Sequence, residues 1–275
     1  MPPIAVVATA GTTNTGAIDD LQAIAAVCRR HDVWMHVDAA YGGPAILSDQ
    51  YGSAIAALAH ADSAVVDPHK WMFVPVEAGL VLVRDGEAMR SAFSLVPPYI
   101  RTQGSAGEVY GLPWFSEYGF QQTRGFRALK VWMAMQQFGT NGYKTAVEEN
   151  IALATYLADR MRSADDFTLM APPSLSVVCF RYVDPAVGSG RAGAASNEEA
   201  VAPEREAALV ALNRAILERL QLSGEAFITS TELRGRFVLR ACIVNYRSTR
   251  DDIDRLLEAV RAIGREASAG SAIKN

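Results

Sequence analysis

Along the first third of the chain, short apolar runs alternate with segments whose apolar residues recur at helical spacing. Four runs rich in β-branched or aliphatic residues, each ended by glycine, proline or aspartate, read as buried strands: residues 4–10, 34–38, 63–67 and 79–83. Behind Asp19 or Asp20, either of which can cap a helix, apolar residues recur at helical spacing: Leu21, Ile24, Ala25 and Val27. A short helix is expected around residues 54–59. This alternation of strand and helix predicts an α/β sheet that is at least partly parallel.

The pattern changes after residue 96. Glycine and proline recur through residues 97–123, which predicts a long loop, and loops of that length are usually functional or disordered. Helices are predicted at residues 124–138, 145–161, 204–220 and 251–266, with strands at 175–182 and 237–243 and a flexible connector at 187–203. We therefore expect a large domain over residues 1–139, containing the mobile loop 97–123, and a small α+β domain over residues 140–275.

Composition narrows the functional classes. The 275-residue chain is half hydrophobic and carries a net charge of -4, so it shows no general affinity for nucleic acid or an anionic membrane. No stretch approaches the ~20 apolar residues of a membrane span. The three cysteines are far apart and form neither a disulfide framework nor a zinc site. The N-terminus has no basic region of the kind that opens a signal peptide, so the expected location is the cytoplasm.

Two predicted strand ends carry chemically informative residues. Asp38 follows an apolar strand, and Lys70 lies between His69 and Trp71 just after another. Taken alone, Asp38 reads as a turn cap and Lys70 as a surface lysine lying along Trp71. Taken together they supply what pyridoxal phosphate (PLP) requires, an amine for its aldehyde and an acid for its pyridine nitrogen. Because ligands bind at the carboxyl ends of strands in open α/β sheets, a shared site is expected there.

Longer segments around these residues resemble a known family. The segments are GTTNTGAIDD at 11–20, HVDAAYGG at 36–43, DPHKW at 67–71, QTRGFRALKVWMAMQQFG at 122–139 and FVLRACIVNYRST at 237–249. They resemble the group II PLP-dependent amino-acid decarboxylases, in the aromatic-L-amino-acid decarboxylase branch. The resemblance implies the PLP-dependent transferase-like α/β fold (aspartate aminotransferase fold type I). The expected parts are a partial large domain with a mixed, mostly parallel sheet and a small α+β C-terminal domain.

The resemblance also implies roles for single residues. Lys70 matches the lysine that holds the PLP aldehyde, and Asp38 matches the partner of the pyridine nitrogen. Ala40 matches a small residue packed on one face of the cofactor ring. His69 matches a histidine that contacts the cofactor phosphate and belongs to the expected catalytic set. Thr13 matches a threonine near the cofactor.

Tyr99 completes the catalytic set implied by the resemblance. It matches a mobile-loop tyrosine that protonates the substrate α-carbon after carbon dioxide leaves. In the family this loop reaches the active site of the other subunit, so the resemblance implies a homodimer with a shared site. The implied reaction is decarboxylation of an L-amino acid, aromatic or related. An aldehyde synthase of the same branch is the alternative, although such enzymes commonly carry phenylalanine at this position.

Only 37 residues precede Asp38. In the family, the turn that anchors the cofactor phosphate lies well upstream of the aspartate strand. The resemblance therefore implies that the chain lacks the N-terminal part of a family member. On that expectation the isolated chain binds PLP weakly or not at all, and a truncated, non-catalytic fragment remains an open alternative.

Overall fold

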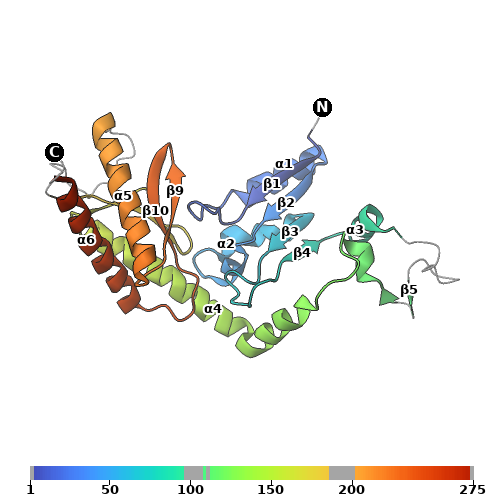
Figure 1. The fold of residues 1–275 in the computed structure, drawn as a ribbon. Coiled ribbons are helices and arrows are strands. Elements are labelled where there is room, and N and C mark those ends of the chain that lie inside the picture. The colour runs from blue at the N-terminus through green and yellow to red at the C-terminus, as the bar shows by residue number, and fades with distance from the viewer. Residues whose placement is uncertain (1–2, 96–107, 110–111, 186–201, 273–275) are drawn as a thin grey trace.

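The computed structural model describes residues 3–95, 108–109, 112–185 and 202–272. The described elements form a four-stranded sheet in the N-terminal part, a second four-stranded sheet in the C-terminal part and a two-stranded ribbon. A long helix, α4 (Arg127–Arg162), passes beneath both parts (Figure 1). Within the described residues, no helix is both long enough and apolar enough to cross a bilayer.

The first sheet has the order β1-β2-β3-β4. Its strands are β1 (Ala5–Thr9), β2 (Trp34–Asp38), β3 (Ser63–Val66) and β4 (Leu80–Val83). The first three strands are parallel and β4 is antiparallel to β3. The predicted mixed, mostly parallel sheet is confirmed. Its register places Thr9, Asp38 and Val65 side by side across the sheet.

Helix α1 (Leu21–His31) covers one face of this sheet. Asp20 caps it by accepting a hydrogen bond from the Ala23 backbone N–H, at 2.9 Å from Oδ1. Three short helical segments follow β2: η1 (Gly43–Leu47), α2 (Gly52–Ile55) and η2 (Ala56–His60). Alanines dominate the core between α1, η2 and the strands, so these elements pack closely.

The apolar runs of β1 and β4 are less buried than their sequences predict. Val7 is 65% exposed and Leu82 is 53% exposed. Both strands form edges of the sheet, and no described element covers the face on which Val7 lies. The apolar runs predicted the positions of the strands correctly but overestimated their burial.

The predicted loop interval 97–123 lies partly outside the described residues. A helix that the sequence reading missed, α3 (Gly86–Phe93), precedes it. The described part of the interval holds the ribbon β5 (Glu108–Val109) and β6 (Leu112–Pro113) and the short helix η3 (Phe115–Tyr118). The carboxylate of Glu117 in η3 is buried and accepts a hydrogen bond from Arg90 Nε at 2.9 Å. This ion pair fastens η3 to α3.

Helix α4 runs from Arg127 to Arg162 and consists of two helical parts that meet at a kink, as the sequence predicts. Gly139 interrupts it with φ of 61° and ψ of 176°, a conformation open to glycine. Gly142, expected to lie between the helices, continues α4 instead. The prediction failed there because α4 buries its next turns, starting at Tyr143, and this packing outweighs the low helix propensity of glycine.

The second sheet is antiparallel and has the order β7-β8-β10-β9. Its strands are β7 (Phe167–Leu169), β8 (Val177–Tyr182), β9 (Thr229–Leu233) and β10 (Arg236–Cys242). Helices α5 (Pro203–Ser223) and α6 (Arg250–Ala272) pack on it together with the second half of α4 (Figure 1). The predicted strands at 175–182 and 237–243 are confirmed within one or two residues. Strands β7 and β9 were missed.

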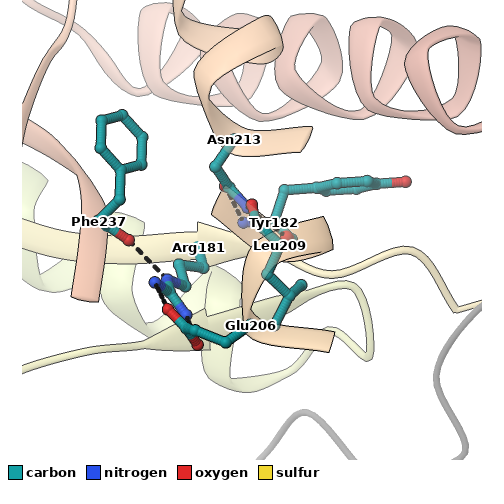
Figure 2. A network of polar contacts seen from close by, with 6 residues as sticks. All are labelled: Arg181, Tyr182, Glu206, Leu209, Asn213 and Phe237. Atoms are coloured by element: carbon teal, nitrogen blue, oxygen red, sulfur yellow. Dashed lines mark hydrogen bonds and ion pairs between the residues drawn. The ribbon is translucent and has the colours of Figure 1, made fainter. Parts of the chain in front are cut away.

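Buried polar contacts fasten α5 to this sheet (Figure 2). Arg181 on β8 is 3% exposed and donates to both oxygens of Glu206, at 2.9 and 2.6 Å, and to the Phe237 carbonyl at 2.6 Å. Asn213, fully buried on α5, accepts from the Tyr182 N–H and donates to the Tyr182 carbonyl. The buried side chains of Arg181 and Asn213 are thereby paired, as burial requires.

The two parts of the chain also share a core. One hydrophobic cluster joins Tyr41 and Trp71 from the N-terminal part to residues beyond 139, among them Val147, Leu175 and Val238. The division into domains at residues 139 and 140 stays a prediction, and this shared core shows that the two parts pack directly against each other.

Candidate active site

Asp38 is the last residue of β2, at the carboxyl edge of the parallel strands. Its carbonyl accepts a hydrogen bond from the Ala10 N–H at 2.8 Å, and its Oδ1 accepts one from the Ala40 N–H at 3.1 Å. The side chain is exposed, and among the described residues no cation lies within ion-pair distance of it. A carboxylate held in this way is available to a cationic group from outside the chain.

The chain turns sharply after Asp38. Gly42 approaches β1 so closely that an added Cβ would lie 2.3 Å from the Ala10 carbonyl oxygen, so only glycine fits there. The Gly42 N–H donates to the same oxygen at 3.2 Å. This close contact explains the glycine in the HVDAAYGG segment and fixes the turn beside the end of β1.

Lys70 lies on the next strand end. Asp67, immediately after β3, donates its N–H to the Ala40 carbonyl at 3.0 Å. The turn that follows is closed by hydrogen bonds from the Lys70 N–H to the Asp67 carbonyl and from the Val74 N–H to the Pro68 carbonyl. The turns that carry Asp38 and Lys70 are therefore hydrogen-bonded neighbours at one edge of the sheet, as the sequence predicts.

The Lys70 side chain has a partner that the sequence reading missed. Its Nζ lies 2.8 Å from Oδ2 of Asp67, and the Lys70 side chain is 43% exposed. His69 Nε2 lies 4.0 Å from the same oxygen. Its Nδ1 lies 2.7 Å from the Ala78 carbonyl oxygen and 3.1 Å from the Ala78 nitrogen, which orients the ring. The sequence signal for this ion pair was the spacing, because Asp67 lies three residues before Lys70 on the same turn.

The remaining predicted site residues divide into two groups. Ala40 lies between the two turns and is half-buried. Thr13 is exposed in the loop that follows β1, at the same edge of the sheet. The neighbouring Thr12 hydroxyl is used within that loop, where it accepts from the Ala17 N–H at 3.0 Å. Tyr99 lies outside the described residues.

The C-terminal part closes over this edge through four buried or half-buried contacts. Tyr41 Oη lies 2.6 Å from Ser176 Oγ, and its ring stacks on Trp71 with centroids 5.1 Å apart. Burial, with Cys242 nearby, raises the pKa of Tyr41 far above its usual range, so this hydroxyl stays protonated. The other contacts are Trp71 to Asn150, Ser174 to the Gly16 carbonyl and Cys179 to the Asn14 carbonyl.

These residues fit PLP. An exposed amine and an unpaired carboxylate lie on adjacent strand ends, which matches the aldehyde and pyridine nitrogen of the cofactor. Histidine and threonine side chains at the same edge offer polar contacts to a phosphate. No group of three or more metal-ligating side chains gathers anywhere in the part of the chain that the structure describes.

Comparison with known proteins identifies the family. Residues 1–183 match the pyridoxal-dependent decarboxylase conserved domain. The chain belongs to this family of pyridoxal-dependent decarboxylases, as the resemblance predicts. The fold agrees, since the chain superposes on the crystal structure of Oryza sativa TDC with PLP and tryptamine with a TM-score of 0.79. That match has 29% identity and covers 95% of this chain and 50% of the other.

Curated relatives show the same similarity. The chain is 34% identical over 266 residues to the aromatic-L-amino-acid decarboxylase of Bacillus atrophaeus, covering 97% of this chain and 52% of that protein. It is 35% identical over 265 residues to the L-2,4-diaminobutyrate decarboxylase of Rhizobium meliloti, covering 96% and 49%. The chain thus spans about half the length of the curated relatives it matches, and those relatives differ in substrate.

Proposed function

We propose that this chain carries the lysine and aspartate of a PLP-dependent amino-acid decarboxylase, which releases carbon dioxide and the amine. The observation that carries the proposal is the hydrogen bond from the Asp67 N–H to the Ala40 carbonyl. It holds the turns of Asp38 and Lys70 at one sheet edge in a chain that belongs to the decarboxylase family. When bound, PLP supplies a protonated ring that accepts the electron pair of the breaking bond.

The role proposed for each residue comes from the family resemblance and is compatible with its position at the sheet edge. Lys70 would hold the cofactor through its aldehyde. Asp38 keeps the proton on the pyridine nitrogen, because a carboxylate without a protein cation favours a cationic partner. His69 lies on the same turn as Lys70, is oriented by Ala78 and would contact the phosphate. Ala40 would pack against the cofactor ring, and Thr13 would border the site.

Asp67 takes a further place in this scheme. Its carboxylate holds the Lys70 ammonium at 2.8 Å and so keeps the side chain near the sheet edge. The amine must leave this ion pair to react. Because Lys70 is partly exposed, the pair is weak enough to open, as surface ion pairs contribute only about 0–1 kcal/mol.

The proposed substrate is an aromatic or related L-amino acid. The support is the 34% identity to the Bacillus aromatic-L-amino-acid decarboxylase. The 35% identity to a diaminobutyrate decarboxylase makes a non-aromatic substrate the alternative. Tyr99 is the proposed donor of the proton to the substrate α-carbon. This assignment rests on the family motif.

We also propose that the protein works as a homodimer with a shared site. The first half of α4 supports this, since it exposes an apolar surface. The exposed side chains are Leu129, Trp132, Met133 and Met135, each more than 40% accessible. Sedimentation of the protein should show a dimer, and a monomer at micromolar concentration would contradict it.

A reducing, cytoplasmic location completes the proposal. It is supported by the three cysteines, which are free thiols, two of them buried in the core. Cell fractionation tests it directly.

The decisive assay for the reaction is product analysis. Purified protein with excess PLP is incubated with a panel of L-amino acids, and products are identified by mass spectrometry. The excess of PLP offsets the weak cofactor binding that the resemblance implies for this chain. Under these conditions we expect amine from at least one aromatic substrate, with Lys70→Ala inactive and Lys130→Ala active. Aldehyde with hydrogen peroxide would indicate the aldehyde synthase reaction instead. PLP held by Lys70 with no product from any amino acid would contradict decarboxylation.

A further inference from the structure

Lys70 and Trp71 are consecutive residues that face opposite ways. The Lys70 side chain is 43% exposed at the sheet edge, whereas Trp71 is fully buried. The backbone between them is short and stiff, so fixing the indole fixes the direction in which Lys70 projects. The contacts that hold Trp71 in place therefore influence the position of the Lys70 amine, the proposed reactive group.

Trp71 is held by one residue of α4. Its Nε1 donates to Asn150 Oδ1 at 2.9 Å, and Asn150 Nδ2 donates to the Asn245 carbonyl at 3.0 Å. Asn150 is 1% exposed, so both bonds are shielded from water. Its amide spans from the Lys70 turn to the chain just after β10, which links the site to the C-terminal sheet.

A second residue on the same helix face holds the turn two residues further on. Tyr143 Oη donates to the Met72 carbonyl at 3.2 Å. Tyr143 and Asn150 are seven residues apart, so they lie on one side of α4 two turns apart. One face of α4 thus forms hydrogen bonds to the Lys70 turn at two successive residues, Trp71 and Met72.

The same turn contains backbone that needs external support. Phe73 has φ of 57°, a left-handed conformation that a bulky residue adopts only under constraint. Its ring is surrounded by Tyr143, Phe138 and Tyr246, with centroids 5.4 to 6.4 Å away. Phe138 and Tyr143 flank the break of α4 at Gly139, which brings both rings onto Phe73.

We propose that Tyr143 and Asn150 on α4 are positioning residues for Lys70, acting through Met72, Phe73 and Trp71. The inference rests on the proposed role of Lys70, and it adds that α4 sets the angle and rigidity of the turn. Neither residue touches the amine. Loss of these hydrogen bonds should therefore make the turn more mobile and slow the binding of the cofactor to Lys70, while leaving the rest of the fold in place.

The first test needs no cofactor. Hydrogen exchange of residues 67–74 reports on the turn, whose amides at Lys70, Phe73 and Val74 are hydrogen-bonded within it. We expect faster exchange there in Asn150→Leu and in Trp71→Phe. The matched control is Tyr156→Phe, which removes a hydroxyl on the same helix that bonds to Asp254 instead. Equal protection of residues 67–74 in all three variants and the parent would overturn the proposal.

The second test measures capture at Lys70. PLP is added, borohydride traps the pyridoxyl group, and peptide mapping gives the ratio of label on Lys70 to label on Lys144. Losing a buried hydrogen bond and leaving its partner unsatisfied shifts such an equilibrium by about tenfold, so we expect roughly a tenfold fall in the ratio for Asn150→Leu. Tyr156→Phe should match the parent. An unchanged ratio in Asn150→Leu would overturn the inference.

A double-mutant comparison separates positioning from general stability. If Asn150 acts through Trp71, the double variant should lose no more Lys70 labelling than either single variant. Multiplied losses would mean that the two residues act separately, against the proposal. Should the parent itself fail to take up PLP at Lys70, the proposed function fails, and the exchange experiment still decides whether α4 holds the turn.

Discussion

Asp67 Oδ2 and Lys70 Nζ lie 2.8 Å apart on a single turn at the carboxyl edge of the parallel strands. Asp67 also anchors this turn to the Asp38 turn, because its N–H donates to the Ala40 carbonyl. Lys70 is the residue expected to carry the cofactor. A carboxylate from its own turn thus keeps the amine near the sheet edge. Three consequences of the site and two of the surrounding fold can be tested.

Removing the carboxylate from this pair should free the amine without harming the fold. In Asp67→Asn we expect faster modification of Lys70 by trinitrobenzenesulfonate. We expect a change of under about 1 kcal/mol in the free energy of unfolding, since the pair is partly exposed. Asp49→Asn is the matched control, because Asp49 pairs with Lys144 at 2.5 Å. It should accelerate modification of Lys144 alone. Unchanged Lys70 reactivity in Asp67→Asn would show that the ion pair does not restrain the amine.

Asp38→Asn should leave the fold intact and impair the reaction. A neutral amide cannot hold the proton on the pyridine nitrogen, and removing a group that stabilises developing charge commonly lowers kcat by about 100-fold or more. The measurement is kcat of the variant and the parent with saturating PLP, with circular dichroism as the check on folding. A kcat in Asp38→Asn within twofold of the parent would rule out this role.

The pair of Arg181 and Glu206 should make stability depend on pH in the acid range. Hydrogen bonds from Arg181 lower the pKa of Glu206 below its ordinary value. Because the pKa of Glu206 is lower in the folded state, its ionised carboxylate stabilises the fold above about pH 4.3, the ordinary pKa of glutamate. This contribution is lost as the pH falls through the pKa of Glu206 in the folded state. At pH 7, Glu206→Gln should lower the free energy of unfolding by about 1.5–3 kcal/mol.

Urea unfolding of both proteins at several pH values checks this. The difference between parent and Glu206→Gln should be largest at neutral pH and should shrink steadily below pH 4.3. A difference that is constant from pH 7 to pH 3 would mean that Glu206 stabilises α5 through packing and not through its charge.

Cys179 should resist alkylation in the native protein. Burial raises the pKa of its thiol to about 11, and its Sγ donates to the Asn14 carbonyl at 3.2 Å. Because only the thiolate reacts readily, iodoacetamide at pH 8 should leave Cys179 unmodified until the chain unfolds. Mass spectrometry before and after denaturation gives the result. Rapid native alkylation of Cys179 would show that the contact between the β1 loop and the second sheet opens in solution.

Much of the site was predictable because it depends on local rules. Apolar runs ended by Asp38 and by the DPHKW segment predicted two strands, and the carboxyl ends of parallel strands share an edge. The structure confirms both strands and joins their turns through Asp67 and Ala40. Sequence could therefore place the pair of Lys70 and Asp38 without coordinates.

The missed features depend on contacts between distant segments. Asn150 and Trp71 are 79 residues apart, and no local pattern connects a helix asparagine to an indole. Strand β9 (TSTEL) is short and largely polar, so it lacks the signal of an apolar run. Gly142 carries a break signal that packing around Tyr143 overrides. The capping aspartate of α3, Asp85, was a usable signal that the sequence reading did not take up.

The central claim, that Lys70 is the residue that holds the cofactor, has a direct test. The chain contains four lysines: Lys70, Lys130, Lys144 and Lys274. Protein incubated with excess PLP is reduced with borohydride, digested and mapped by mass spectrometry. We predict a pyridoxyl group on Lys70 in large excess over the other three, and its loss in Lys70→Ala. Label spread evenly over the four lysines, or concentrated on Lys130 or Lys144, would contradict the account.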